Sequence, residues 1–155
     1  MIARRLKWYL DSHGVDYDLV HHTYTPTMAE TAEAAHIPAG RVAKCVLFED
    51  ERGYVLVVVP ASCRVELEAL DQALGRHLEL ATEDELDQIF EGCGHGALPP
   101  IGAAYNIPMA IDQSLLRLAD VYFEAGDHEE LVHVNAAGFR ELLLGARPGK
   151  FSRPH

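Results

Sequence analysis

Lys44 is the residue whose type and position most suggest chemistry. The chain holds three lysines, and this one lies between Val42-Ala43 and the apolar run 45–48. Burying an ammonium in an apolar strand costs free energy unless the group is paired or reaches water. Two interpretations therefore stay open. Lys44 is either a strand-end lysine that extends into solvent, or a fixed positive charge facing an anionic ligand or a polarised carbonyl.

A loop at residues 92–102 is the second candidate for chemistry. Its sequence, GCGHGALPPIG, has four glycines and two prolines in eleven residues, which predicts a shaped loop. Glycine lets backbone N–H groups approach a ligand, proline fixes their direction, and such groups stabilise oxyanions during ester hydrolysis. The alternative is a structural turn. A dinucleotide-binding motif is not supported, because the Gly92-Cys93-Gly94 segment follows a predicted helix and not a strand.

Histidines are the third candidate, as potential metal ligands. Several of the nine fall in or near predicted loops and strand ends, namely His21, His22, His95, His128 and His133. No HExxH or HxH pair appears, and the three cysteines form no CxxC pair, so we expect no metal site, no cofactor and no disulfide framework. The chain also lacks a GxSxG elbow and any obvious nucleophile–base pair.

Hydrophobic periodicity predicts the elements that must position these residues. Helices are expected over 2–13, 28–36, 66–74, 83–90, 113–118 and 136–144, and strands over 15–21, 42–48, 54–59, 78–81, 109–111, 121–123 and 131–134. Thr27, Thr82, Asp112 and Asn135 are the expected helix caps. The unbroken apolar content of 42–59 predicts a hairpin at the sheet centre. Helices interleaved with a mixed sheet indicate an α+β domain.

Length and charge limit the class of protein. The 155 residues suggest one domain, and 24 acidic against 13 basic side chains give a net charge of -11. The bases gather at the ends: Arg4, Arg5 and Lys7 in residues 1–10, and Arg147, Lys150 and Arg153 in residues 142–155, with no acid in either stretch. The middle therefore holds 24 acids and 7 bases, or -17. The composition excludes a mainly disordered chain, and no secretory signal or membrane span is present, which favours a cytoplasmic protein.

Five segments, in chain order, resemble the YbaK / prolyl-tRNA-synthetase-associated domain family, whose members deacylate mischarged tRNA. They are Thr31–Ala35, similar to its "eAA" helix; Arg41–Lys44 with the following apolar strand, similar to the segment carrying its characteristic lysine; Gly96–Gly102, similar to its GxxxP loop; Ile111–Leu116; and Phe123–Val132. Together they cover roughly residues 2–144. The resemblance implies a strongly curved mixed sheet of about six to seven strands with surrounding helices. It also implies one editing domain over residues 1–145, followed by a flexible basic tail over 146–155.

The resemblance further implies a function and a site. The protein would be a free-standing aminoacyl-tRNA deacylase, with the tRNA acceptor end as substrate, transient contact with a synthetase, and no membrane or DNA partner. Lys44, Gly96, Pro100 and Gly102 would be the catalytic residues, with water or a terminal ribose hydroxyl as the attacking group. Substrate-binding residues would be Ala97, Leu98, Pro99, Ile101, Asp112 and His128, or else His133.

One departure from the family pattern bears on specificity. The branch that deacylates Cys-tRNA tends to carry a polar Gly-Gly-x-Ser-Pro-x-Gly loop, whereas Leu98-Pro99 replaces the polar part here. Alanine on proline tRNA is therefore as plausible a substrate as cysteine. Two other classes of function stay open: a catalytically silent binding or regulatory module that associates with a synthetase or other partner, and a metal-dependent hydrolase that uses the histidines.

Overall fold

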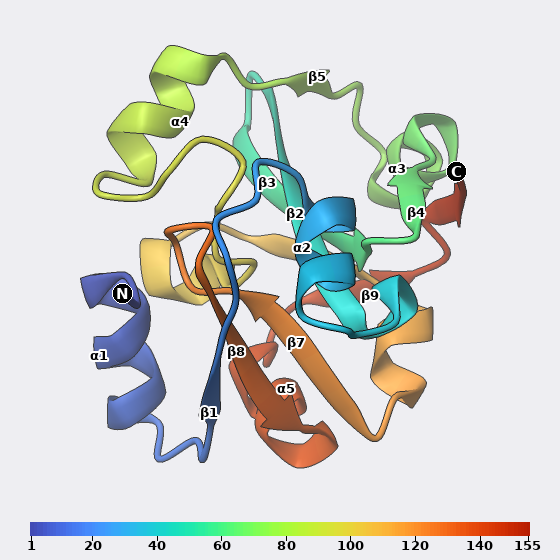
Figure 1. Ribbon diagram of the computed structural model, residues 1–155. Helices are drawn as coiled ribbons and strands as arrows, with labels where there is room; N and C mark the ends of the chain where they lie inside the picture. Colours follow the sequence, from blue (N-terminus) through green and yellow to red (C-terminus); the bar gives the residue numbers. More distant parts are fainter.

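A curved mixed sheet organises the molecule (Figure 1). The computed structural model describes all 155 residues. The main sheet has eight strands in the order β1-β8-β7-β2-β3-β6-β9, with β5 pairing β2 outside this path. Its strands are β1 (Asp18–His21), β2 (Val42–Asp50), β3 (Gly53–Pro60), β5 (Glu79–Leu80), β6 (Met109–Asp112), β7 (Asp120–Glu124), β8 (Glu130–Asn135) and β9 (Arg147–Gly149). A second, two-stranded sheet joins β4 (Cys63–Val65) to β10 (Ser152–Pro154). The predicted α+β class is confirmed.

The β2–β3 hairpin forms the centre of this sheet, as its sequence predicts. Its antiparallel register runs from Ala43↔Pro60 to Asp50↔Gly53. β3 alternates between the two faces: Leu56 and Val58 enter a cluster of 23 buried residues, whereas Val57 and Val59 enter one of 8. A strand buried on both faces requires apolar residues at every position, which explains the unbroken run.

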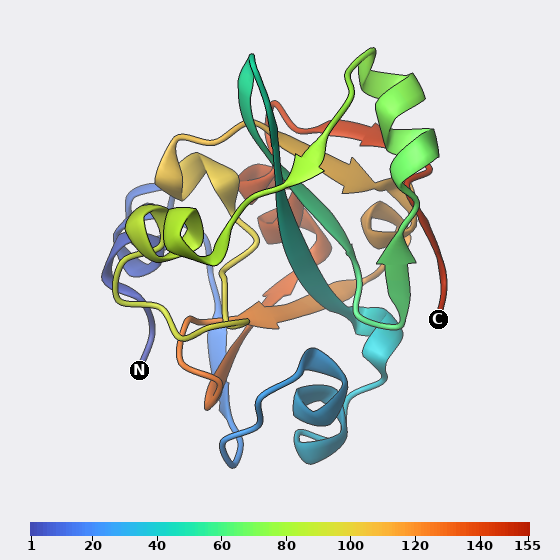
Figure 2. The same cartoon turned by 90° about the horizontal axis from the view of Figure 1, so that it is seen from above.

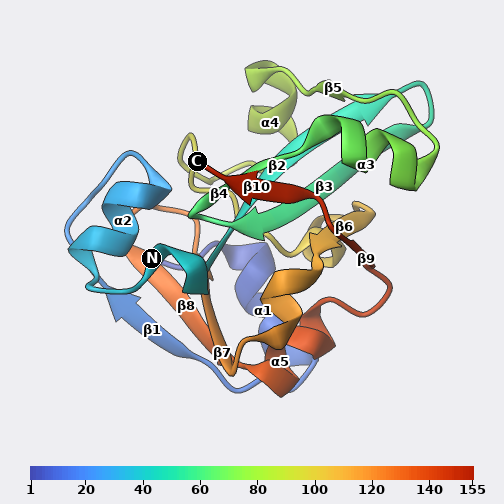
Figure 3. The same cartoon turned by 90° about the vertical axis from the view of Figure 1, so that its right-hand side faces the viewer.

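Helices and a small ribbon cover the two faces of the hairpin (Figure 3). The helices are α1 (Arg4–Ser12), α2 (Met28–Ala34), α3 (Leu67–Leu74), α4 (Glu83–Ile89) and α5 (Ala136–Leu142). In Figure 3, α1 and α5 lie on one side of the hairpin, while α3 and the β4–β10 ribbon lie on the other. Side chains from α1 and α5 belong to the larger cluster, and Leu70 of α3 belongs to the smaller one.

The four predicted caps are present. Thr27 accepts a hydrogen bond from the N–H of Glu30, and Thr82 forms a reciprocal capping box with Glu85. Asn135 accepts from the N–H of Gly138. Asp112 caps residues 113–117, although this segment is a 3-10 helix. These contacts satisfy N–H groups that a helix leaves without a partner in its first turn.

Two neighbouring strands separate at the point that matters for the site. β2 and β7 are parallel, but they pair only at Val42↔Tyr122 and Ala43↔Phe123. The next residues along the two strands are Lys44 and Glu124. Ligands of sheets with parallel strands commonly bind where neighbouring strands part, because the backbone there is free of pairing. Seen from above in Figure 2, the hairpin crosses the molecule and leads away from β7.

The C-terminal residues differ from their predicted flexible state. β9 pairs β6 in parallel, and β10 pairs β4 antiparallel. Between them the Phe151 side chain is 1% exposed and belongs to the smaller cluster. The prediction of a loose tail over 146–155 is therefore wrong. Its prolines suggested a loop, but proline is compatible with short edge strands, and burial of Phe151 anchors the segment.

None of the helices is both long enough and apolar enough to cross a lipid bilayer.

Candidate functional site

Lys44 is half-buried near the beginning of β2, at the point where β2 leaves β7. Its Nζ lies 3.0 Å from Nε2 of His155, and no carboxylate pairs with it. Burial lowers the pKa of the Lys44 ammonium, while the nearby Cys63 opposes this decrease. Lys44 therefore supplies a positive charge that is partly desolvated and not neutralised, as an anion-binding or carbonyl-polarising group requires.

The loop of residues 92–102 lies against this part of the sheet. The Sγ of Cys45, the residue after Lys44, donates to the carbonyl oxygen of Leu98 over 3.4 Å. On the other side, the N–H of Gly94 donates to the carbonyl oxygen of Gly126 over 2.9 Å. The loop is thus attached to β2 at one point and to the β7–β8 turn at another, so it spans the divergence of the two strands.

Several backbone N–H groups of this loop lack an acceptor. The N–H of Ala97 donates to Gly94, but those of Gly96, Leu98 and Ile101 have no acceptor within the protein. Gly96 has φ +77°, a left-handed conformation that favours glycine. A Cβ at this position would lie 3.5 Å from Cε1 of His128 and 3.6 Å from the carbonyl oxygen of Pro26. The left-handed turn is therefore what favours glycine here, since a Cβ would make only ordinary contacts.

Gly102 has a different role from the one its motif implies. Its N–H already donates to the Sδ of Met109, and a Cβ there would lie 2.5 Å from the carbonyl oxygen of Ile107. It closes the loop against the core, so its N–H is not available to a substrate. Pro99, Pro100 and Ile101 are buried in the same stretch and fix the course of the loop.

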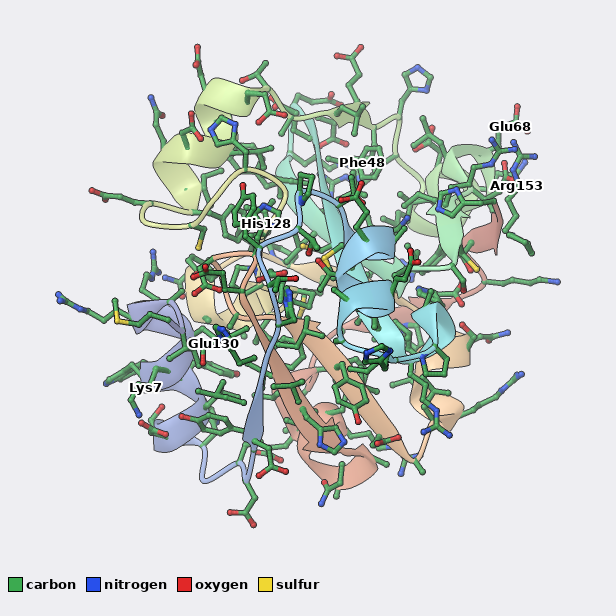
Figure 4. All side chains as sticks on the ribbon, in the orientation of Figure 1. Lys7, Phe48, Glu68, His128, Glu130 and Arg153 are labelled. Carbon is green, nitrogen blue, oxygen red and sulfur yellow. The ribbon has the colours of Figure 1, made fainter.

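His128 connects the loop to the β7–β8 turn. The residue is 1% exposed, and its ring Nε2–H donates to the carbonyl oxygen of His95. The carbonyl can only accept, so Nε2 carries the proton and Nδ1, which has no partner, is unprotonated in the neutral ring. Its backbone lies in the left-handed region, with φ +62°. Figure 4 shows His128 in the turn that precedes β8, below the loop.

Glu124, which the sequence analysis did not single out, is buried beside His128. Its Oε1 accepts the N–H of His128 over 2.9 Å, and its Oε2 has no partner. Burial raises the pKa of Glu124, while the N–H groups of His128 and Gly126 and the nearby His22 oppose the increase. An acid enclosed by Phe123 and Ala125 at the end of an apolar strand is the sequence signal that could have identified it.

His133 and Asp112 belong to other clusters of the structure. His133 Nε2 donates to Asp120 over 2.7 Å, and its ring stacks on Tyr122. Asp112 accepts from the N–H of Phe151 over 2.8 Å and from Ser114, so both of its oxygens are occupied. The structure thus joins the loop to His128, whereas Lys44 contacts His155, and His133 and Asp112 pair with Asp120 and Phe151.

No ready nucleophile lies beside the loop. Burial raises the pKa of the Cys45 and Cys93 thiols, which keeps both protonated at neutral pH. No three His, Cys, Asp or Glu side chains are arranged to hold a metal ion. Backbone N–H groups without acceptors can hold a carbonyl ester while an external hydroxyl or water attacks.

Fold and site together define an α+β domain whose loop of residues 92–102 has backbone N–H groups without acceptors. The chain belongs to the aminoacyl-tRNA editing domain family, whose sequence model matches residues 22–142. The family predicted from the sequence is confirmed.

Relatives agree with this assignment. The chain aligns over 106 residues with the proline–tRNA ligase of Thermosipho melanesiensis at 28% identity. The alignment covers 68% of the chain and 18% of the ligase. The ligase of Thermosipho africanus is 32% identical over 84 residues, covering 52% of the chain and 15% of the ligase. The chain therefore spans less than a fifth of the length of these ligases.

Solved structures share the fold. A candidate trans-editing enzyme for prolyl tRNA synthetase superposes with a TM-score of 0.84 at 26% identity, covering 97% of this chain and 96% of the other. A hypothetical protein, APE2540, gives a TM-score of 0.83 at 22% identity, covering 97% of this chain and all of the other. The second match concerns the fold alone.

Proposed function

We propose that this protein is a trans-acting aminoacyl-tRNA deacylase that hydrolyses the ester of mischarged proline tRNA. Membership of the editing family, and the likeness along nearly its whole length to a candidate trans-editing enzyme, support this activity. The observation that carries the proposal is the pair of N–H groups without acceptors at Gly96 and Leu98, in a loop that is attached to β2 at Cys45, next to Lys44, whose ammonium has no carboxylate partner.

The proposed mechanism places the ester carbonyl oxygen against the N–H groups of Gly96 and Leu98. Attack on the carbonyl carbon by water, or by water activated through the terminal ribose hydroxyl, generates an oxyanion there. Donors aimed at a developing oxyanion lower the activation barrier. Each of them raises kcat by a factor of about 10²–10³. The bond from carbon to the ribose oxygen then breaks, and the released ribose hydroxyl takes up the proton of the attacking water. Lys44 holds the substrate by its ester or an adjacent phosphate.

The proposed amino acid is small, alanine or cysteine. Leu98 is half-buried in the otherwise buried apolar stretch 97–100, and we assign it the contact with the amino acid side chain. The His128 ring adjoins the loop at Gly96, and we assign it the role of limiting the size of the amino acid side chain.

Purified protein mixed with proline tRNA charged with alanine, cysteine, serine or proline tests the proposal. We expect loss of the alanyl or cysteinyl ester and preservation of the prolyl ester, without added synthetase. If none of the mischarged esters is cleaved faster than in buffer, the deacylase proposal fails. A stable complex with a synthetase in that case would favour the silent binding module.

A further inference from the structure

The turn between β7 and β8 binds two segments that are distant from it in the sequence. Toward the loop, Gly126 accepts the N–H of Gly94, and the His128 ring donates to His95. Toward the N-terminal segment, the N–H of His22 donates to Glu129 over 2.8 Å, and that of Thr25 donates to His128 over 3.3 Å. The position of the loop therefore depends on the conformation of this turn.

Glu124 fixes that turn from inside the molecule. Its Oε1 accepts the N–H of His128 over 2.9 Å, across a turn in which His128 adopts φ +62°. A left-handed conformation is unfavourable for a residue other than glycine, so it needs support from its surroundings. The N–H of His128 has no other acceptor, which makes this hydrogen bond the local support of the conformation.

The carboxylate is costly at this position. Glu124 is 1% exposed, no cation pairs with it, and its Oε2 lacks a partner. Two more buried atoms close to the turn also lack partners, His22 Nε2 and His128 Nδ1. Burial raises the pKa of Glu124 in spite of the N–H groups that face it, so desolvation of the charged form outweighs what these hydrogen bonds return. Stability alone therefore does not account for an acid here.

We propose that Glu124 is a positioning residue of the deacylation reaction. It fixes the backbone of His128, whose ring fixes the carbonyl group of His95, and this in turn sets the direction of the next N–H in the loop, that of Gly96. This inference rests on the proposed function, because the N–H of Gly96 is one of the donors assigned to the oxyanion. A misplacement of about 1 Å at such a donor can cost about 10²-fold in rate.

Two conservative variants separate positioning from charge. Glu124→Gln keeps the length of the side chain and an oxygen that accepts the N–H of His128, but removes the charge. Glu124→Asp keeps the charge but withdraws it by one methylene. We expect Glu124→Gln to retain most of kcat, and Glu124→Asp to lose about tenfold or more with KM little changed. The reverse order, an active Asp variant and an inactive Gln variant, would overturn positioning in favour of an electrostatic role.

A matched control measures the effect of stability. Asp50 lies at the far end of β2, with its side chain 3% exposed and paired to Arg76, so Asp50→Asn also disturbs a buried carboxylate. We expect this variant to unfold more readily than the wild type and to keep its kcat. If kcat falls in Asp50→Asn as it does in Glu124→Asp, the loss reflects stability, and the positioning role is rejected.

Hydrogen exchange tests the inference without any turnover. The amides of Gly94 and Ala97 are bonded in the loop and serve as probes. We expect Glu124→Asp to accelerate their exchange, while Glu124→Gln and Asp50→Asn leave it close to that of the wild type. Another outcome is that the wild type hydrolyses no ester while the loop amides of the variants exchange hydrogen at the expected rates. In that case the proposed function fails, and the role of Glu124 in positioning the loop is supported. Unchanged exchange in Glu124→Asp would overturn the positioning role.

Discussion

The Nζ of Lys44 lies 3.0 Å from the Nε2 of His155, a residue 111 positions away in the sequence. An ammonium has only protons to offer, so the imidazole Nε2 must accept and be unprotonated in this contact. The β4–β10 ribbon positions His155, whose N–H donates to Ser62 over 3.3 Å. A substrate that binds Lys44 must therefore share or displace this contact.

Replacement of His155 should free Lys44. We expect His155→Ala to lower KM for aminoacyl-tRNA a few-fold, because a net hydrogen bond of about 1 kcal/mol corresponds to roughly fivefold in affinity. Steady-state kinetics of ester hydrolysis measure the change. His77→Ala, a histidine with an exposed side chain beside α3, is the control. An unchanged KM in His155→Ala would contradict competition for Lys44.

Removal of the Lys44 charge should abolish most of the activity. Because Lys44 has no carboxylate partner, Lys44→Met leaves no buried counter-ion behind, and the fold should persist. We expect kcat/KM to fall about 10²-fold or more, the size of a lost electrostatic contact to the transition state. Circular dichroism verifies the fold, and a variant with normal turnover would remove Lys44 from the proposed site.

A methyl group at Gly96 should harm activity more than one at Gly92. Both glycines have positive φ, +77° and +86°, so alanine strains the backbone similarly at the two positions. Only at Gly96 would the new Cβ contact His128, whereas the space around Gly92 is open. We expect similar losses of stability from the two variants, about 1 kcal/mol, and a loss of kcat confined to Gly96→Ala. Equal kcat in both would show that the loop tolerates a side chain at Gly96.

The Asp50–Arg76 pair should make the protein sensitive to acid. The Arg76 guanidinium lowers the pKa of Asp50 from 3.8 to about 2. A carboxyl whose pKa is depressed by folding stabilises the native state above its unfolded pKa, and this contribution is lost as pH falls from about 4 to about 2. Urea unfolding across this range should show the decrease, and Asp50→Asn should flatten it. The same slope in both proteins would exclude Asp50 as the cause.

The basic residues of α1 should contribute to tRNA binding. A groove runs along Arg4, Arg5 and Lys7 to Gly92, where the loop begins. Arg5 also lies over the Tyr105 ring, 4.8 Å from its centroid. We expect Arg4→Gln with Arg5→Gln to weaken binding of tRNA and to reduce the dependence of log K on log salt by about 1–2, since each phosphate contact contributes about 0.7–0.9.

The bases at the C-terminal end lie elsewhere on the molecule. Lys7 and Arg153 are on opposite sides in Figure 4, and Arg153 pairs with Glu66 over 3.0 Å. Deletion of 146–155 would remove strands and the buried Phe151, so substitution is the better test of this end.

Arg52→Gln with Arg64→Gln serves as the control for the α1 variant, because Arg52 lies at the tip of the β2–β3 hairpin. Equal salt slopes in the α1 and control variants would exclude the groove.

The sequence by itself determined the local elements and the family. Periodicity placed the β2–β3 hairpin, and Thr27, Thr82 and Asn135 were identified as caps, because both signals depend on residues only a few positions apart. The glycines and prolines of 92–102 identified the loop for the same reason. Five short segments in order were enough to recognise the editing family.

Only the tertiary structure decided what these elements do to one another. His128 was expected at the site, but its contact with the loop and its support by Glu124 depend on a turn in the left-handed region. His133 and Asp112 were expected at the site. In the structure His133 forms a hydrogen bond to Asp120 on the neighbouring strand, and Asp112 accepts one from the N–H of Phe151, which is distant in the sequence. The tail was expected to be loose, but Phe151 and two strand pairings order it. Such outcomes depend on burial and on partners brought together by folding, and these long-range contacts have no local pattern in the chain.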